Sequence, residues 1–193
     1  MSKTNKEPFI VAVDDGYAQT KLVGESPNGE GLIKNIMRST VRPGKYGLGN
    51  FGGGGISSYE TEEGEHFTVS NEIESESTQF DGFHTSTLNR VLVHHSLVSA
   101  GYGGKQIKLV TGLPVADYFL DDEKDEEHIA SKSNNLTKTV SSGDKLMPQI
   151  LDVKVGCQAV AAWFDHVLDD KIEQKSEISG RTAIVDIGGR TTD

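Results

Sequence analysis

The chain contains, near its beginning, the stretch Val11-Ala12-Val13-Asp14-Asp15-Gly16-Tyr17-Ala18-Gln19-Thr20-Lys21. A second stretch of similar chemistry is Ile184-Val185-Asp186-Ile187-Gly188-Gly189-Arg190-Thr191-Thr192-Asp193. Each is a β-branched apolar strand that ends in Asp and is followed by glycine and by hydroxyl or amide residues. The tip of such a hairpin offers backbone N–H groups to a phosphate, and the Asp suits a hydrated divalent cation. Two such hairpins, far apart in the sequence, predict a nucleotide held between two halves of a molecule.

Length and charge narrow the class of protein. With 193 residues and 20.9 kDa the chain can form one good core with a small inserted subdomain. Its net charge of −10 argues against direct nucleic-acid binding, because phosphate backbones are bound through clustered Lys and Arg. The single cysteine, Cys157, excludes an intramolecular disulfide. The sequence has no apolar leader and no membrane-length apolar run, so we expect a soluble, cytoplasmic protein without membrane contact.

Periodicity predicts strands alternating with two helices, an α/β arrangement. We expect strands over residues 9–13 and 20–23, paired as a hairpin, and over 31–37, 65–69, 106–111, 138–140, 150–155 and 182–187. We expect helices over 86–100 and 157–168, the second with an apolar side of Val160, Trp163, Phe164, Val167 and Leu168. Residues 39–58, rich in Gly, Pro and Ser, are expected to be loop. The acidic run 121–127 is interpreted as a solvated helix face rather than a cation site.

The first hairpin offers three kinds of phosphate-binding group. A carboxylate of Asp14 or Asp15 can hold waters of a bound Mg²⁺, since this ion keeps most of its hydration shell. Gly16 lets the backbone turn towards a phosphate, and Lys21 on the return strand brings a positive charge. An Asp-Gly turn without any ligand is the competing interpretation of this stretch alone.

The second hairpin is more specific, because two glycines and two threonines after an acid-terminated strand suit a phosphate better than a simple turn. A tight Gly-Gly hairpin remains the alternative. Between the two hairpins, Gln158 begins a helix directly after a strand, where its amide can orient a water for attack on a terminal phosphate. The alternative for Gln158 is an amide bonded to its own backbone. The neighbouring His94 and His95 point about 100° apart on a helix and are interpreted as structural.

Taken in order, these motifs resemble the plasmid-segregation actins of the ParM/StbA family. The resemblance rests on the two hairpins, on Val91-Leu92-Val93-His94-His95-Ser96-Leu97 and on Thr111-Gly112-Leu113-Pro114-Val115-Ala116-Asp117-Tyr118. It implies an actin-like, ribonuclease-H-like α/β fold with a mixed sheet flanked by helices. It further implies domain I over residues 1–180, with an insertion at about 39–85, and only the first strand of domain II over 181–193. The chain thus resembles the first half of a family member and is expected to bind nucleotide poorly by itself.

The resemblance also implies a function and a set of site residues. The function is that of an ATPase whose hydrolysis is coupled to polymerisation into filaments that segregate plasmid DNA, with an adaptor protein bound to centromere DNA as partner. The implied cofactors are ATP and Mg²⁺, the metal held through water by Asp14 and Asp186. Gln158 and Asp186 take the catalytic positions. The implied nucleotide-binding residues are Asp14, Asp15, Gly16, Tyr17, Lys21, Gly188, Gly189, Arg190 and Thr191.

Two departures from the family pattern and two other functions stay open at this point. Tyr17 and Arg190 stand where the family has smaller residues, and Arg190 can either add charge at the phosphate or point away. A small-molecule kinase of the actin, Hsp70 and sugar-kinase superfamily would use the same loops without self-association. A non-catalytic actin-like module that docks to filaments is the third possibility.

Overall fold

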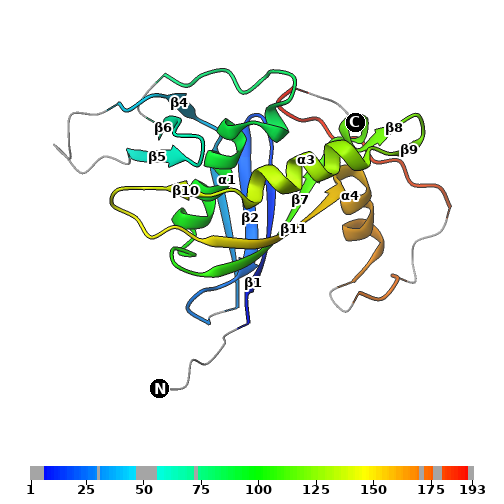
Figure 1. Ribbon diagram of the computed structural model, residues 1–193. Coiled ribbons are helices and arrows are strands. Elements are labelled where there is room, and N and C mark those ends of the chain that lie inside the picture. The colour runs from blue at the N-terminus through cyan, green and yellow to red at the C-terminus, as the bar shows by residue number, and fades with distance from the viewer. Residues whose placement is uncertain are drawn as a thin grey trace.

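The computed structural model describes residues 7–29, 31–46, 56–71, 74–169, 172–175 and 180–190. Its strands are β1 (Phe9–Asp15), β2 (Gln19–Glu25), β3 (Leu32–Arg38), β4 (Val41–Pro43), β5 (Ser57–Thr61), β6 (His66–Val69), β7 (Gln106–Leu113), β8 (Phe119–Leu120), β9 (Glu123–Lys124), β10 (Val140–Ser141) and β11 (Gln149–Cys157). Its helices are the 3₁₀ turn η1 (Phe83–Thr85), α1 (Thr87–Ser99), α2 (Val115–Tyr118), α3 (Glu126–Thr137) and α4 (Gln158–Val167). Figure 1 shows their arrangement.

A mixed five-stranded sheet forms the centre of the fold, in the order β11-β7-β1-β2-β3. β1 and β2 pair antiparallel, as the sequence predicts, and β2 pairs antiparallel with β3. β1, β7 and β11 run parallel, so their carboxyl ends meet at one edge of the sheet. This edge is where the first hairpin, Gly112 and the start of α4 come together, and parallel strands place ligand sites there.

Helices α1 and α3 cover one face of this sheet (Figure 1). The core between them contains alternate residues of the strands with Val93 and Leu97 of α1 and Leu136 of α3. Ser86 caps α1 by accepting a hydrogen bond from the Asn89 backbone N–H. Nine of the thirteen residues of α1 are buried, and the helix lies within the expected range 86–100.

A smaller four-stranded sheet, in the order β10-β5-β6-β4, lies beside the large one. It has its own apolar cluster, in which Tyr59 and Phe67 pack against Leu88 and Leu92 of α1. Most of this sheet comes from residues 41–69, within the expected insertion, whereas β10 comes from much later in the chain. The domain boundaries themselves stay a prediction.

Three expectations are wrong in part. Residues 39–58 are not all loop, because β4 and the start of β5 pair with β6 there. The acidic run 121–127 is not one helix face: Asp121 and Asp122 turn between β8 and β9 with positive φ, and Asp125 caps α3, a helix that the sequence analysis missed. Residues 182–187 form no strand in the described part of the chain, because Ile187 alone makes a β-bridge and the pairing does not extend to its neighbours.

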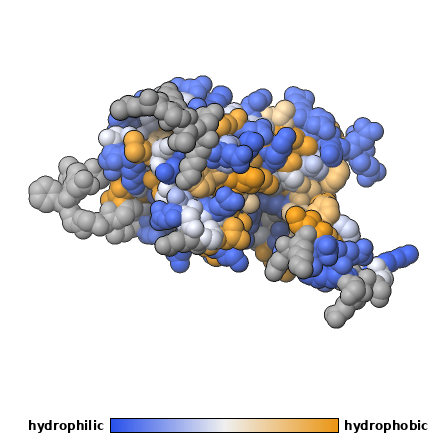
Figure 2. All heavy atoms as spheres, turned by 90° about the horizontal axis from the view of Figure 1, so that it is seen from below, coloured by the Kyte–Doolittle hydropathy of each residue, from blue (hydrophilic) through white to orange (hydrophobic). Residues whose placement is uncertain are grey.

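Some apolar side chains remain exposed. On the large sheet these include Ile10, Leu32, Ile36, Val110 and Leu151, and on α4 they include Val160, Trp163 and Phe164. Patches of apolar surface are visible between hydrophilic regions in Figure 2. Over the described ranges, no helix is both long enough and apolar enough to cross a membrane.

Candidate functional site

A cavity of about 300 Å³ lies at the edge of the sheet where the parallel strands end. Its lining brings together both predicted phosphate loops, the start of α4 and one residue of η1. The residues are Asp14, Gly16, Tyr17, Ala18, Gln19, Lys21, His84, Pro114, Gln158, Asp186, Ile187, Gly188 and Gly189. The two hairpin sequences, more than 160 residues apart, thus share one cavity.

The pleat of β1 sends the two neighbouring aspartates to opposite faces of the sheet, because successive strand residues alternate. Val11, Val13 and Asp15 are buried on the face covered by α1 and α3. Asp14 lies on the open face, opposite Lys21 of β2. The sequence predicts both aspartates as ligand groups, but of the two only Asp14 lines the cavity.

Asp14 is held by two polar partners at the cavity wall. Lys21 Nζ donates to Asp14 Oδ2 at 2.9 Å, and Gln158 Nε2 donates to Asp14 Oδ1 at 3.2 Å. The hydrogen bond to Asp14 raises the pKa of Lys21 against the opposing effect of burial, and the charges of Asp14 and Asp186 add to the rise. Lys21 therefore stays a cation beside the cavity, as the phosphate-binding interpretation requires.

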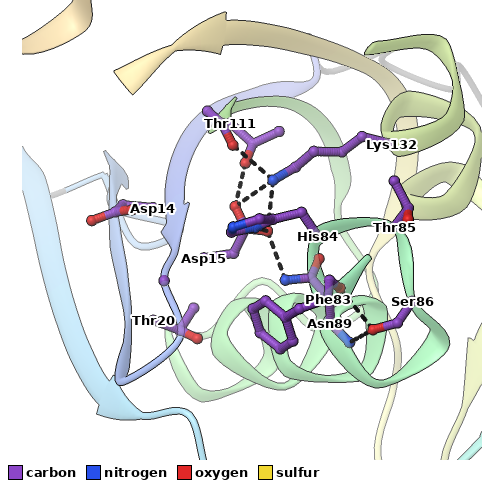
Figure 3. Close-up of polar contacts among 12 residues, drawn as sticks. Asp14, Asp15, Thr20, Phe83, His84, Thr85, Ser86, Asn89, Thr111 and Lys132 are labelled. Atoms are coloured by element: carbon purple, nitrogen blue, oxygen red, sulfur yellow. Dashed lines mark hydrogen bonds and ion pairs between the residues drawn. The ribbon is translucent and has the colours of Figure 1, made fainter. Parts of the chain in front are cut away.

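Asp15 lies in a fully buried network under the first loop (Figure 3). Its carboxylate accepts two hydrogen bonds from Lys132 Nζ, at 2.8 and 2.9 Å, one from Thr111 Oγ1 at 2.6 Å and one from Asn89 Nδ2 at 2.7 Å. Burial by itself would raise the pKa of Asp15, but Lys132 and His84 beside it bring the pKa well below its ordinary value. The protein itself thus supplies four hydrogen bonds to this carboxylate, and the nucleotide-binding role of Asp15 stays a prediction.

Close contacts shape the first loop. A Cβ at Gly16 would lie 3.0 Å from the backbone oxygen of Gln19, so a side chain there would crowd the turn. The carbonyl oxygen of Gly16 accepts from Ser39 Oγ at 2.8 Å, and that of Tyr17 accepts from Thr78 Oγ1 at 2.5 Å. With both carbonyl oxygens engaged, the loop is fixed from outside the hairpin.

The second loop contacts the first directly. A Cβ at Gly189 would lie 2.8 Å from Ala18 Cβ, which is closer than two carbon atoms can pack. Gln79 Nε2 donates to the Gly189 carbonyl at 2.8 Å, and the guanidinium of Arg190 pairs with Asp81 Oδ1 at 2.6 Å. The same guanidinium lies 5.5 Å from the centre of the Tyr17 ring. Arg190 thus points away from the cavity lining, while Thr191 is outside the described residues.

Gln158 is the first residue of α4, immediately after β11, as the sequence predicts. A Cβ at Gly112 would lie 2.6 Å from Gln158 Cγ, so the glycine on the neighbouring strand makes room for this side chain. The amide of Gln158 bonds the side chain of Asp14. The geometry therefore disagrees with the competing interpretation, in which the amide only caps its own helix.

A hydrated cation fits the two carboxylates of Asp14 and Asp186, which line the same cavity. Mg²⁺ usually needs few protein groups because it keeps several waters. No cluster of three or more His, Cys, Asp or Glu side chains suited to a metal occurs among the described residues.

Sequence reasoning missed four residues of the network around Asp15, namely His84, Asn89, Thr111 and Lys132. The alternation of Val11, Val13 and Asp15 in one strand was a usable signal that Asp15 faces the core. No signal could identify Lys132, since its helix was not predicted.

Comparison with known proteins bears on the family and the fold. A family model described as "Plasmid segregation protein ParM, N-terminal" matches residues 9–169. Among solved structures, the fold matches Ta0583, an archaeal actin homolog, with a TM-score of 0.59 and 19% identity over 81% of this chain and 47% of that one. Actin-like protein Alp7A matches with a TM-score of 0.63 and 14% identity over 86% of this chain and 49% of that one.

A third match is the AlfA filament bound to AMPPNP, with a TM-score of 0.52 and 12% identity over 84% of this chain and 59% of that one. Ta0583 has also been solved in complex with ADP. At these identities the structural matches establish an actin-like fold, and the chain spans about half the length of Ta0583 and Alp7A. No curated protein matches the chain significantly.

Proposed function

The chain belongs to the ParM/StbA plasmid-segregation family, and on this premise we propose that it forms the N-terminal part of an actin-like ATPase that polymerises into filaments to move plasmid DNA. The observation that carries the proposal is the shared cavity of the two loops. The bound ADP of Ta0583 and the bound AMPPNP of the AlfA filament support a nucleotide as the occupant.

The first loop and the second loop divide the nucleotide-binding roles. Gly16 and Tyr17 of the first loop, and Gly188 and Gly189 of the second, offer backbone to the phosphates of ATP, and Lys21 neutralises phosphate charge. Thr191 keeps its proposed place in the second loop. Arg190 acts indirectly in this proposal, by fixing the second loop through Asp81.

Asp14 and Asp186 would hold Mg²⁺ through water, which when bound neutralises charge on the phosphates. Gln158 is proposed to orient the attacking water. Its Nε2 donates to Asp14, which leaves its carbonyl oxygen as the acceptor for a water proton. In this arrangement Asp14 orients the side-chain amide of Gln158. The backbone of Gln158 is held in place because it is the first residue of α4.

Self-association into filaments is proposed from family membership, and the AlfA filament supports it. A separate adaptor bound to centromere DNA would connect the filament to its plasmid. The net charge of −10 is consistent with this division, since a filament that reaches DNA through an adaptor needs no basic surface of its own. A cytoplasmic location belongs to the same proposal, because the proposed plasmid partner lies there.

Sedimentation with ATP, Mg²⁺ and the natural-length protein tests the proposal. We expect ATP-dependent pelleting together with phosphate release, and no phosphorylated sugar or other small molecule. Phosphorylation of a small molecule without pelleting would instead indicate a kinase, and pelleting only with preformed filaments would indicate a docking module.

Two variants separate the proposed catalytic roles. Asp186→Ala is expected to abolish hydrolysis, and Gln158→Ala to slow hydrolysis by about a hundredfold while keeping nucleotide affinity within a factor of about three. Gln149→Ala is the matched control, because Gln149 lies at the opposite end of β11 from Gln158. Equal hydrolysis rates for Gln158→Ala and Gln149→Ala would remove Gln158 from the mechanism.

A further inference from the structure

His84 is a buried histidine in the cavity lining that the proposed mechanism does not use. It lies in η1, directly before α1, and its side chain is 2% exposed. Figure 3 shows its ring beside Asp15, under the first loop. The rings of Tyr17 and Phe83 pack against it, with ring centres 4.9 and 5.2 Å away. These contacts fix the position of the imidazole.

Neither ring nitrogen of His84 has a hydrogen-bond partner among the described residues. Nδ1 lies 3.6 Å from Asp15 Oδ2, which is too long for a hydrogen bond. Native proteins leave few buried polar groups unpaired, because each one loses its bonds to water without replacement. The ring nitrogens of His94 are also without a partner in the described part of the chain, but of the two histidines only His84 lies in the cavity lining, where a ligand can supply the missing acceptor.

The protein acceptors around His84 are already engaged. Asp15 accepts from Lys132, Thr111 and Asn89, and its charge is balanced by Lys132. The loop carbonyl oxygens of Gly16 and Tyr17 accept from side chains of other segments. Asn89 Oδ1 is a buried acceptor without a partner among the described residues, but no hydrogen bond joins it to His84. A donor on His84 thus has no bonded acceptor among the described residues, and the oxygen-rich group for which this cavity is suited is a phosphate.

Building on the proposed function, we propose that His84 is a phosphate-binding residue, whose imidazole N–H donates to a phosphate oxygen of the nucleotide in the cavity. Every protonation state of histidine carries at least one N–H, so the contact does not depend on the ring being charged. The residue would also link the nucleotide to the small sheet and α1, since η1 lies between β6 and α1 in the chain.

The test compares His84→Phe with His94→Phe in the natural-length protein, by titration with ATP. Phe keeps the aromatic packing but removes both nitrogens. His94 is an equally buried histidine, 2% exposed, in the middle of α1 and outside the cavity lining. We expect about tenfold weaker ATP binding for His84→Phe and less than twofold change for His94→Phe, since a hydrogen bond to a charged group is lost only in the first.

Two further measurements keep the outcome decisive. His84→Gln retains an amide N–H and is expected to recover part of the affinity. In the unsubstituted protein, the imidazole ¹⁵N resonances of His84 are expected to shift on addition of ATP while those of His94 stay in place. The resonance measurement tests the proposal even if His84→Phe fails to fold.

The outcomes separate the two proposals. If the unsubstituted protein does not bind ATP, the proposed function fails, and this inference fails with it. If the unsubstituted protein binds ATP but His84→Phe binds it equally well, or the His84 resonances do not move, the role of His84 alone is refuted.

Discussion

The two phosphate loops have similar sequences but different structural support. The first is the turn of a regular hairpin in a five-stranded sheet, above a fully buried polar network. The second, over residues 186–190, follows no strand in the described part of the chain, and side chains of residues 79 and 81 hold it. Local sequence therefore sets the chemistry of a loop, whereas its rigidity depends on partner strands and on what lies beneath it.

The largest expected effect is a loss of stability when the buried ion pair beneath the first loop is broken. Lys132→Met leaves the carboxylate of Asp15 buried without its cation, and breaking such a pair costs about 3 to 5 kcal/mol of unfolding free energy. Urea denaturation measures this loss. The double variant Asp15→Asn with Lys132→Met removes both charges and is expected to recover most of it. A loss below about 1 kcal/mol for the single variant would contradict the assigned role of the pair.

The polar network around Asp15 also shows which features of the site can be predicted from the sequence and which cannot. The hairpin, the buried helix before β7 and the glutamine at the start of α4 were all predicted, because alternation, helical period and glycine positions are local signals. The meeting of the two loops was predicted from the likeness of their motifs. The partners of Asp15 were not, since Lys132 is brought to it by tertiary packing across 117 residues of sequence.

The strand expected over residues 182–187 failed for a related physical reason. Val185 and Ile187 have the β-branched character of a strand, yet they are 69% and 79% exposed. A strand is stabilised by hydrogen bonds to a neighbour and by burial of at least one face. Within the described residues, pairing is limited to one β-bridge at Ile187 and most of residues 182–187 are exposed, so the local preference does not extend into a strand.

Acid provides a second way to weaken the first loop. The pKa of Asp15 is lower in the folded protein than the ordinary value of about 3.9. The carboxylate therefore contributes stability above that pH, and the contribution is lost as the pH falls below it. We expect the unfolding free energy of the parent to fall below about pH 4 more steeply than that of the double variant. Parallel pH curves for the two proteins would contradict this expectation.

Alanine substitutions at one glycine of each loop compare the rigidity of the two loops, and their expected effects on stability are of intermediate size. Gly16→Ala places a Cβ against the backbone oxygen of Gln19 inside a rigid turn, and we expect a loss of about 1 to 2 kcal/mol. Gly189→Ala places a Cβ against Ala18, but the weakly held second loop can move away, so we expect a change within about 0.5 kcal/mol. ATP affinity is expected to fall in both variants. Similar stability losses would mean that the two loops are equally rigid.

The smallest effect is expected where only the attachment of the second loop is removed. Asp81→Ala releases Arg190 from an exposed ion pair, which leaves the thermal midpoint unchanged because such pairs contribute little. The backbone amides of residues 186–190 are nevertheless expected to exchange hydrogen faster, while those of the first loop keep their rates. Unchanged exchange in the second loop would assign its attachment to the hydrogen bond from Gln79 to Gly189, which Gln79→Ala then tests on the same amides.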